Sequence, residues 1–233
     1  MRISTDILRD NPDFQLIETM LFRHRIRFLE DHLARMRLSA RVFEIPFNER
    51  AIRGEVADVL RSLDMDASYK IRLTLNVIGK VSCEKTRISA EINTKSNAVK
   101  RLCISPVAVN SENLFFYHKT TRRELYESEY TRAQSAGFYE ILFLNQHGTV
   151  TEASRNNVLI KVGDTIYTPP LRCGLLGGVY RKQLLQRCGN IIEAELSLSD
   201  LKQASSIYLT NAVRGLRKIN GPLELPELSR EDM

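Results

Sequence analysis

Residues 138–160, FYEILFLNQHGTVTEASRNNVLI, decide the fold, because they hold three short strand signals in close succession. The first and last parts, FYEILFLN and NNVLI, are rich in apolar and β-prone residues. The turn Gln146-His147-Gly148 leads into a short strand that ends at Glu152. The stretch therefore predicts neighbouring strands, with a carboxylate at the end of one of them.

The chain that follows continues the same mixture of strands and short helices. NNVLIKV and DTIYTPP predict a hairpin around Gly163-Asp164. Gly177-Gly178 then opens the helix VYRKQLLQRC. The remaining predicted elements are a strand near Ile191, a helix over Leu198–Ala204 and the strand SSIYLTNAV, residues 205–213.

The preceding residues predict a smaller group of elements. FQLIETMLF, Phe14–Phe22, is strand-like, and the helical spacing of Leu29, Leu33, Met36, Ala40 and Phe43 predicts a helix that ends before Pro46. Further predicted elements are helices at Ala51–Leu63 and Thr121–Ser135, and strands at 68–77, Val81–Ile92 and Leu102–Val109. This irregular order predicts an α+β fold with two lobes, residues 1–110 and 111–233.

Composition excludes several classes of protein. Of the 233 residues, 43% are hydrophobic and 27% charged, as in an ordinary soluble protein. No apolar run is long enough to span a bilayer, and the polar N-terminus lacks the apolar core of a signal peptide, which predicts a cytoplasmic protein. The net charge of +6 is dispersed. We therefore expect a solvated surface and an anionic small-molecule ligand rather than a nucleic acid or a membrane.

The four cysteines, Cys83, Cys103, Cys173 and Cys188, form no C-x-x-C pair. Reduced thiols are the expected state, and no metal site is predicted.

Lys119, in FFYHKTTRREL, is the first candidate for chemistry. It follows an apolar and aromatic run, and a desolvated lysine has a lowered pKa and becomes a better nucleophile or base. Taken alone, the pattern favours a lysine at the rim of a helix, with its stem on apolar surface.

Three further positions carry weaker signals. Glu152 is either a turn residue or an acidic partner for a cofactor nitrogen. The helix that begins at Val179 and Tyr180 offers backbone N–H groups to a phosphate. Thr210 and Asn211, at a strand end, suit either an anion contact or a simple turn.

Six blocks together resemble one family, the class IV pyridoxal-phosphate (PLP) aminotransferases. This group includes branched-chain and D-amino acid aminotransferases and 4-amino-4-deoxychorismate lyases. The blocks stand in the family's order from about Phe14 to Arg217. They are FQLIETML, EDHLARMRLSA, HKTTRRELYE, EILFLNQHGTVTEASRNNVLI, TPPLRCGLLGGVYR and YLTNAVRGL.

The resemblance implies the fold-type IV architecture, with a small α/β N-terminal lobe and a larger, barrel-like, cofactor-binding C-terminal lobe. It also implies a role for each matching residue. Lys119 would hold PLP as a Schiff base and move the proton, while Glu152 would keep the pyridine nitrogen protonated. The phosphate would be bound by Arg35, by the N–H groups of Val179 and Tyr180, and by Thr210, Asn211 and Ala212. Thr19 and Arg123 match positions close to the cofactor.

Some residues depart from the family pattern. Asn11-Pro12-Asp13 stands where Gly-Asp-Gly is usual, Gly177 replaces a proline, and Glu124 replaces a tyrosine of the branched-chain enzymes. These departures leave the cofactor residues in place and bear on the substrate instead.

Three functions follow from the resemblance. The first is a lyase that releases pyruvate from 4-amino-4-deoxychorismate and forms 4-aminobenzoate, because the short start and the Asn-Ala-Val-Arg-Gly block are most similar to that type. The second is an aminotransferase for branched-chain or D-amino acids, and the third is a non-catalytic binding protein. A homodimer is expected in each case, because the family builds its site at a subunit interface and because Phe14–Phe22 and Phe115-Phe116-Tyr117 offer apolar surface.

Overall fold

The computed structural model describes residues 11, 13–89 and 99–224, which divide into two compact units. Unit 1 holds residues 11 and 13–89 together with the short segments 118–122 and 212–214. Unit 2 holds residues 99–117, 123–211 and 215–224. The sequence placed the boundary at residue 110, whereas residues 99–117 lie with unit 2, because strand β5 pairs with β6.

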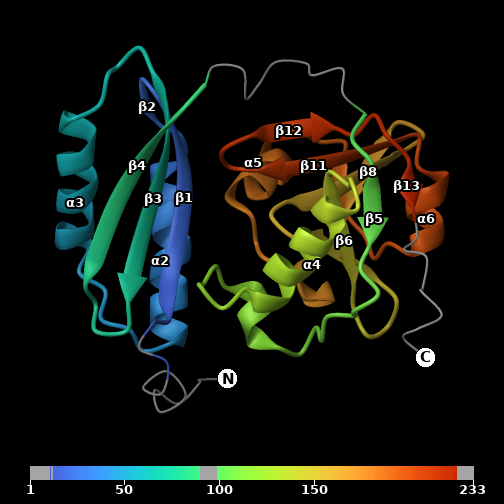
Figure 1. Cartoon of the computed structure of the whole chain (residues 1–233), viewed down its shortest axis with the longest axis horizontal. Helices are drawn as coiled ribbons and strands as arrows, with labels where there is room; N and C mark the ends of the chain where they lie inside the picture. The colour runs from blue at the N-terminus through green and yellow to red at the C-terminus, as the bar shows by residue number, and fades with distance from the viewer. Residues whose placement is uncertain (1–10, 12, 90–98, 225–233) are drawn as a thin grey trace. The chain divides into compact units, whose positions relative to one another are not determined.

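Unit 1 is an antiparallel sheet with two helices (Figure 1). The strands lie in the order β2-β1-β3-β4, where β1 is Gln15–Arg23, β2 Arg25–Ile26, β3 Ser68–Asn76 and β4 Val81–Ile88. Helix α2, Leu29–Val42, packs on β1, and α3, Glu49–Arg61, packs on β4.

The sequence pattern explains this packing. Buried and half-buried residues alternate along β3, and Ile71, Leu73 and Leu75 are at most 1% exposed. The matching positions of α2, Leu33 and Met36, are buried as their helical spacing predicts. The predicted strand Val81–Ile92 ends earlier, at Ile88, and its residues 90–92 lie outside the described part.

Unit 2 is a larger mixed sheet with helices around it. Its described strands follow the order β10-β9-β8-β7-β6-β5-β13, and β11 pairs with both β8 and β12. The strand bounds are β5 Leu102–Ile104, β6 Glu140–Leu144, β7 Val150–Ala153, β8 Asn157–Val162, β9 Thr165–Thr168, β10 Ile191–Glu193, β11 Ser206–Asn211, β12 Gly215–Lys218 and β13 Leu223–Glu224. The helices are α4 Glu124–Ser135, α5 Val179–Arg187 and α6 Leu198–Gln203, with 3-10 turns at Leu114–Tyr117 and Leu171–Cys173.

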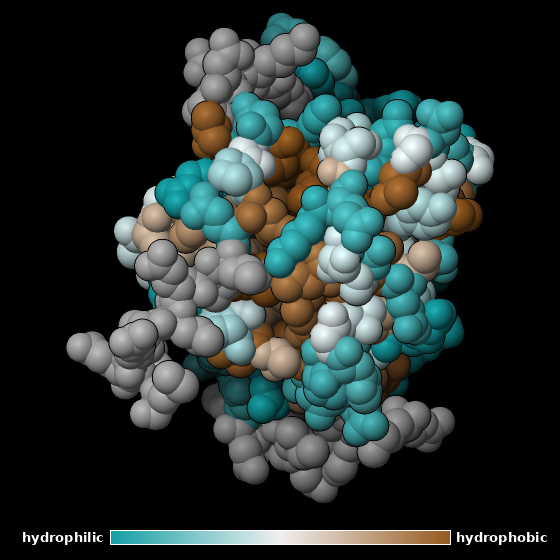
Figure 2. Space-filling view, turned by 90° about the vertical axis from the view of Figure 1, so that its right-hand side faces the viewer, coloured by the Kyte–Doolittle hydropathy of each residue, from teal (hydrophilic) through white to brown (hydrophobic). Residues whose placement is uncertain are grey.

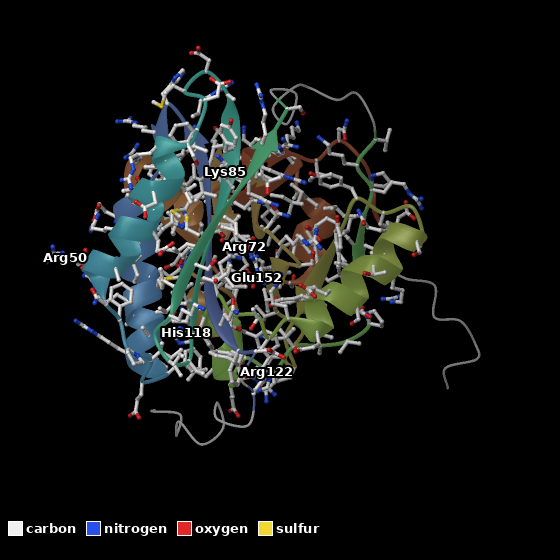
Figure 3. The ribbon with its side chains drawn as sticks, turned by 60° about the vertical axis from the view of Figure 1, so that its left-hand side comes forward. Arg50, Arg72, Lys85, His118, Arg122 and Glu152 are labelled. Atoms are coloured by element: carbon white, nitrogen blue, oxygen red, sulfur yellow. The ribbon has the colours of Figure 1, made fainter. Side chains whose placement is uncertain are left out.

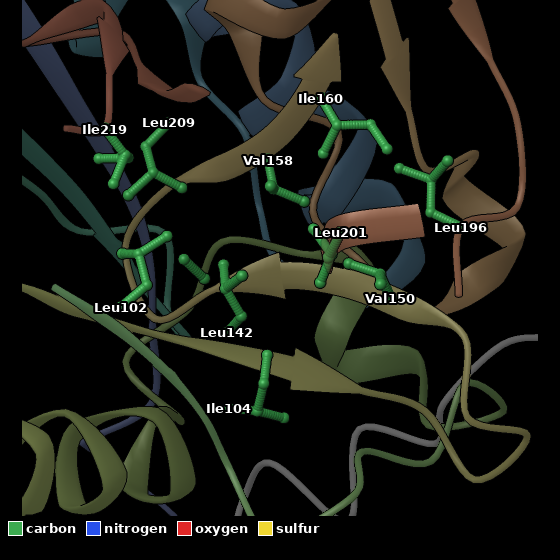
Figure 4. Packing of buried hydrophobic residues seen from close by; sticks show 11 residues of the cluster. Leu102, Ile104, Leu142, Val150, Val158, Ile160, Leu196, Leu201, Leu209 and Ile219 are labelled. Atoms are coloured by element: carbon green, nitrogen blue, oxygen red, sulfur yellow. The ribbon is translucent and has the colours of Figure 1, made fainter. Parts of the chain in front are cut away.

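The core of unit 2 lies between these strands and α6 (Figure 4). Leu142 on β6, Val150 on β7 and Val158 on β8 are fully buried there, and Leu201 of α6 packs against them. The apolar runs of residues 138–160 thus supply both the strands and the core that holds them in register.

Two predicted elements begin or end elsewhere. The helix expected from Thr121 begins at Glu124, because residues 118–122 run beside β1 instead. The strand expected over Leu102–Val109 ends at Ile104, and only a single bridge forms at Val109. Strands β2, β12 and β13 were not predicted, because a segment of two to four residues is too short for a clear pattern of alternation in the sequence.

Candidate active site

The predicted site residues fall into two groups, one in each unit. Unit 1 contains Thr19, Arg35, Lys119 and Ala212, and unit 2 contains Arg123, Glu152, Val179, Tyr180, Thr210 and Asn211.

Lys119 lies on a short extended segment that is fixed to β1. Its carbonyl accepts a hydrogen bond from Ile17 N at 2.9 Å, and the neighbouring Thr120 forms a bridge with Leu16. Thr121 closes the segment, because its N–H donates to Gln15 O and its hydroxyl accepts from Gln15 N, both at 2.9 Å. These bonds hold the backbone of a half-buried lysine on both sides.

His118 anchors the same segment to α2 (Figure 3). Its Nδ1 lies 2.8 Å from Ser39 Oγ, and its ring meets Phe43 edge to face at 5.0 Å. Burial lowers the pKa of His118, which favours a neutral ring that packs rather than one that titrates. Nothing in the HKTT motif itself predicts this contact, because Ser39 is distant in sequence.

Arg35 is paired with a buried carboxylate. Its Nε donates to Glu18 Oε1 at 2.8 Å and its Nη2 to Glu18 Oε2 at 2.6 Å. His32 Nδ1 lies 2.6 Å from the same Oε2. Because an ionised carboxylate can only accept a hydrogen bond, the proton of this bond is on Nδ1. Glu18 and His32 are at most 1% exposed, while the Arg35 side chain is 14% exposed.

Burial on its own raises the pKa of Glu18, but Arg35 and His32 outweigh it and lower that pKa to about 2. Because the folded pKa lies below the ordinary 4.5, the ionised carboxylate stabilises the fold fully above about pH 4.5. That stabilisation is lost as the pH falls towards 2.

We therefore expect Glu18→Gln to lower the free energy of unfolding by about 3 kcal/mol at neutral pH, since it leaves the half-buried Arg35 and the buried His32 with a poorer partner. The variant should also lose most of the dependence of stability on pH between about 4.5 and 2. Urea unfolding across this range measures both effects. Glu30→Gln is the matched control, because Glu30 pairs with Arg53 at the exposed surface, where solvent screens the pair, and it should change both far less. Equal effects of the two variants would contradict the prediction.

Thr19 lies on the opposite face of the sheet from Glu18, beside Arg72 of β3 in the strand register. Arg72 is half-buried (Figure 3), and among the described residues no carboxylate forms an ion pair with it, although Glu84 is its register partner on β4. The alternation of polar and apolar residues in YKIRLTLNVI places Arg72 on the polar face of the strand. This alternation was the available signal for Arg72, which was not among the predicted site residues. A half-buried cation of this kind suits an anionic ligand.

Glu152 is held by two donors in unit 2. Tyr126 of α4 donates from its hydroxyl to Oε1 at 3.1 Å, and Asn157 donates from Nδ2 to Oε2 at 3.0 Å. Burial, and then the Glu152 charge, raise the pKa of Tyr126 well above 10, so the phenol stays a donor. Glu152 itself is 6% exposed. Both donors favour the ionised form of this buried carboxylate.

Arg123 lies close to this group but has its own partners. Its Nη2 donates to Ser154 O, and its guanidinium lies over the Tyr126 ring at 5.3 Å from the centroid. The structure thus places Arg123 against Tyr126, which donates to Glu152, and against the backbone of Ser154.

The start of α5 has the features of an anion site. Gly178 precedes Val179 and provides no side chain to cap the helix, and the first turn has no acidic residue. A β-carbon at Gly178 would lie 1.9 Å from Asn157 Oδ1, so only glycine fits. The positive end of the helix dipole is therefore close to other polar groups and is not neutralised within its own first turn.

Thr210 and Asn211 end β11, and Ala212 begins the turn to β12. The Asn211 side chain donates to Asn156 Oδ1 at 2.7 Å. Thr210 is 1% exposed, and its hydroxyl has no hydrogen-bond partner among the described residues. A buried hydroxyl without a partner is costly, which is the expected mark of a group that serves a ligand.

A family model fits these observations. The model for aminotransferase class IV matches residues 15–221, and so covers both units. The chain belongs to this family. It is therefore a PLP-dependent enzyme with the fold-type IV architecture, as its sequence blocks predicted.

Three relatives describe the similarity. A protein of Schizosaccharomyces pombe named "Putative aminodeoxychorismate lyase" is 28% identical over 215 residues, 87% of either chain. A crystal structure from Mesorhizobium loti, described as a "Putative amino-acid aminotransferase", is 30% identical, has a TM-score of 0.78, and is matched over 91% of this chain and 100% of that one. A PLP-bound hypothetical aminotransferase from Mycobacterium tuberculosis shares the fold, with a TM-score of 0.76, 19% identity and coverage of 99% and 88%.

The residues present fit PLP. A phosphate needs N–H and hydroxyl donors, and the α5 start and the unpartnered Thr210 hydroxyl provide these groups. A pyridine nitrogen needs an ionised acid, and Glu152 is a buried carboxylate with two donors. Among the described residues no cluster of His, Cys, Asp or Glu could hold a metal ion, and no helix there could cross a membrane.

Proposed function

We propose that this class IV enzyme is a 4-amino-4-deoxychorismate lyase, which releases pyruvate and leaves 4-aminobenzoate. The observation that carries the proposal is the likeness to the S. pombe protein of that name, which extends over 87% of both chains. Glu124 weighs against the branched-chain alternative, because the branched-chain enzymes carry a tyrosine at the matching position.

An aminotransferase is the second candidate, favoured by the 30% identity to the M. loti protein. Both functions require the same first step, so the residues that hold the cofactor do not distinguish them. A non-catalytic binding protein is disfavoured, because Lys119 and Glu152 are both present at their family positions.

In this proposal each residue has a defined task. Lys119 would hold the cofactor covalently through Nζ; the substrate amine would displace Nζ, and the freed Nζ amine would then accept a proton from the substrate carbon. Glu152 keeps a proton on the pyridine nitrogen, because a buried carboxylate favours a cation beside it. When bound, PLP supplies an electron sink for the carbon that loses its proton. Arg72, beside Thr19, offers a positive charge to a substrate carboxylate.

Product analysis tests the proposal. The PLP-loaded protein is incubated with 4-amino-4-deoxychorismate without any keto acid, and pyruvate and 4-aminobenzoate are measured. Equal amounts of both products support the lyase. Turnover only with an amino acid and 2-oxoglutarate would favour the aminotransferase instead. If neither reaction were observed, the non-catalytic binding protein would be the remaining candidate.

Arg35, whose guanidinium also forms a fork with Glu18, is proposed to bind the cofactor phosphate. We expect Arg35→Lys to weaken PLP binding by about 2 kcal/mol, roughly thirtyfold, because an ammonium cannot keep the fork to Glu18 and contact a phosphate as well. Affinity for pyridoxal, which lacks the phosphate, should change little. Fluorescence titration measures both dissociation constants, and an equal loss for both ligands would contradict the phosphate role.

A homodimer is also proposed. Figure 2 shows hydrophobic residues gathered at the centre of one face and hydrophilic residues around them, a distribution that suits association. Two-fold dimers are the commonest soluble oligomers. We expect sedimentation at micromolar concentration to give twice the mass of 26.7 kDa. A monomer that still turns over substrate would show that a single chain is sufficient.

A further inference from the structure

Asn157, the first residue of β8, is in direct contact with one of the groups proposed to hold PLP, is paired in register with another, and lies against the residues that precede α5. It is paired in register with Glu152 of β7 on one side and with Thr210 of β11 on the other. Residues paired across neighbouring strands have side chains on the same face, so the three side chains form a row. Asn157 is 5% exposed, which removes water as an alternative partner for its amide.

The two amide protons of Asn157 have separate acceptors. Nδ2 donates to Glu152 Oε2 at 3.0 Å and to Leu176 O at 2.9 Å. Since a carboxylate and a carbonyl can only accept, the nitrogen must face both, and the orientation of the amide is settled. The oxygen lies against Gly178, where a β-carbon would come within 1.9 Å of it.

We propose that Asn157 is a positioning residue that fixes the Glu152 carboxylate and the start of α5 relative to each other. It thereby sets the distance between the contact for the pyridine nitrogen and the contact for the phosphate. This inference rests on the proposed roles of Glu152 and of the Val179 and Tyr180 N–H groups. An asparagine suits the task because it donates twice from one atom, whereas serine donates once and aspartate does not donate at all.

The test uses two measurements on the PLP-binding protein. The first is the ratio of the dissociation constants for pyridoxal and PLP, which reports on the phosphate contact. The second is the pH titration of the visible band of bound cofactor, which follows the Schiff-base nitrogen and responds to the charge on the pyridine nitrogen conjugated with it. We expect Asn157→Asp to lower the ratio about tenfold and also to displace the titration, since it removes a donor to both ends.

Four comparison variants accompany Asn157→Asp. Glu152→Gln should change the titration and leave the ratio, whereas Gly178→Ala, whose β-carbon would displace the Asn157 amide oxygen, should change both. Gly177→Ala is the control for Gly178→Ala, because its β-carbon would meet only Leu171 methyl groups at 3.6 Å or more. Asn190→Ala is the control for Asn157, because Asn190 also donates to a carbonyl but at an exposed turn. Both controls should leave both measurements unchanged.

The outcomes distinguish this inference from the proposed site. If Glu152→Gln changes the titration and Gly178→Ala changes the ratio, but Asn157→Asp changes only one measurement or neither, Asn157 does not couple the two ends. If Glu152→Gln and Gly178→Ala change nothing, the assignment of the site itself is wrong. A loss of thermal stability in Asn157→Asp with both measurements unchanged would leave a purely structural role and overturn the proposal.

Discussion

Lys119→Ala is expected to abolish turnover, with a loss of at least ~10³-fold, because no other group in the proposed mechanism forms the covalent link or removes the proton. The fold should tolerate the change. The segment is held by the backbone bonds of residues 119–121 to β1 and by the His118 contact with Ser39, none of which uses the lysine side chain. The variant should still bind PLP through the phosphate contacts, without the absorption band of the covalent form.

Borohydride reduction provides the direct measurement for Lys119. Reduction of the PLP-loaded wild type should attach the cofactor to a peptide that contains Lys119, and mass spectrometry identifies the peptide. Lys85→Ala is the matched control, because Lys85 is exposed on β4 and donates to Ser62 O. A label on any lysine other than Lys119 would disprove the assignment.

The local pattern of the sequence was enough to predict most of the elements. The helical spacing of Leu33 and Met36 and the alternation around Ile71 and Leu73 are properties of neighbouring residues, and the structure has these elements within a few residues of the prediction. The start of α4 differs because the segment around Lys119 pairs with β1, which is about a hundred residues earlier in the chain. A long-range pairing of this kind leaves no periodic signal.

The sequence pattern also did not indicate which residues contact the candidate site residues. Glu18 reaches Arg35 from a different element, and Tyr126 reaches Glu152 across 26 positions. Asn157 looked like one polar residue among several in SRNNVL, and only the register of β7, β8 and β11 shows that it stands between Glu152 and Thr210. The sequence blocks thus provide the candidate cofactor residues, which stay a prediction, whereas the residues that contact and orient these candidates follow from the packing of the strands and helices.

Glu152→Gln is expected to keep the fold and the cofactor but to lower kcat by roughly 10²- to 10³-fold, the cost of losing one preorganised electrostatic group. The change is nearly isosteric, and its partners can adapt. Asn157 Nδ2 still finds an amide oxygen, and the Tyr126 hydroxyl can turn from donor to acceptor towards the new NH₂ group. We therefore expect little change in the free energy of unfolding, which separates this variant from a folding defect.

The loss in Glu152→Gln should fall on kcat and leave KM nearly unchanged, because a neutral amide holds no proton on the pyridine nitrogen at the point where negative charge develops. Steady-state kinetics at saturating PLP measure this division. Tyr126→Phe is the informative companion, since it removes one donor to Oε1 and keeps the carboxylate, and we expect a much smaller loss of kcat. If Glu152→Gln turned over at the wild-type rate, Glu152 would have no part in the chemistry, and the two donors that hold it would serve only the stability of β7 and β8.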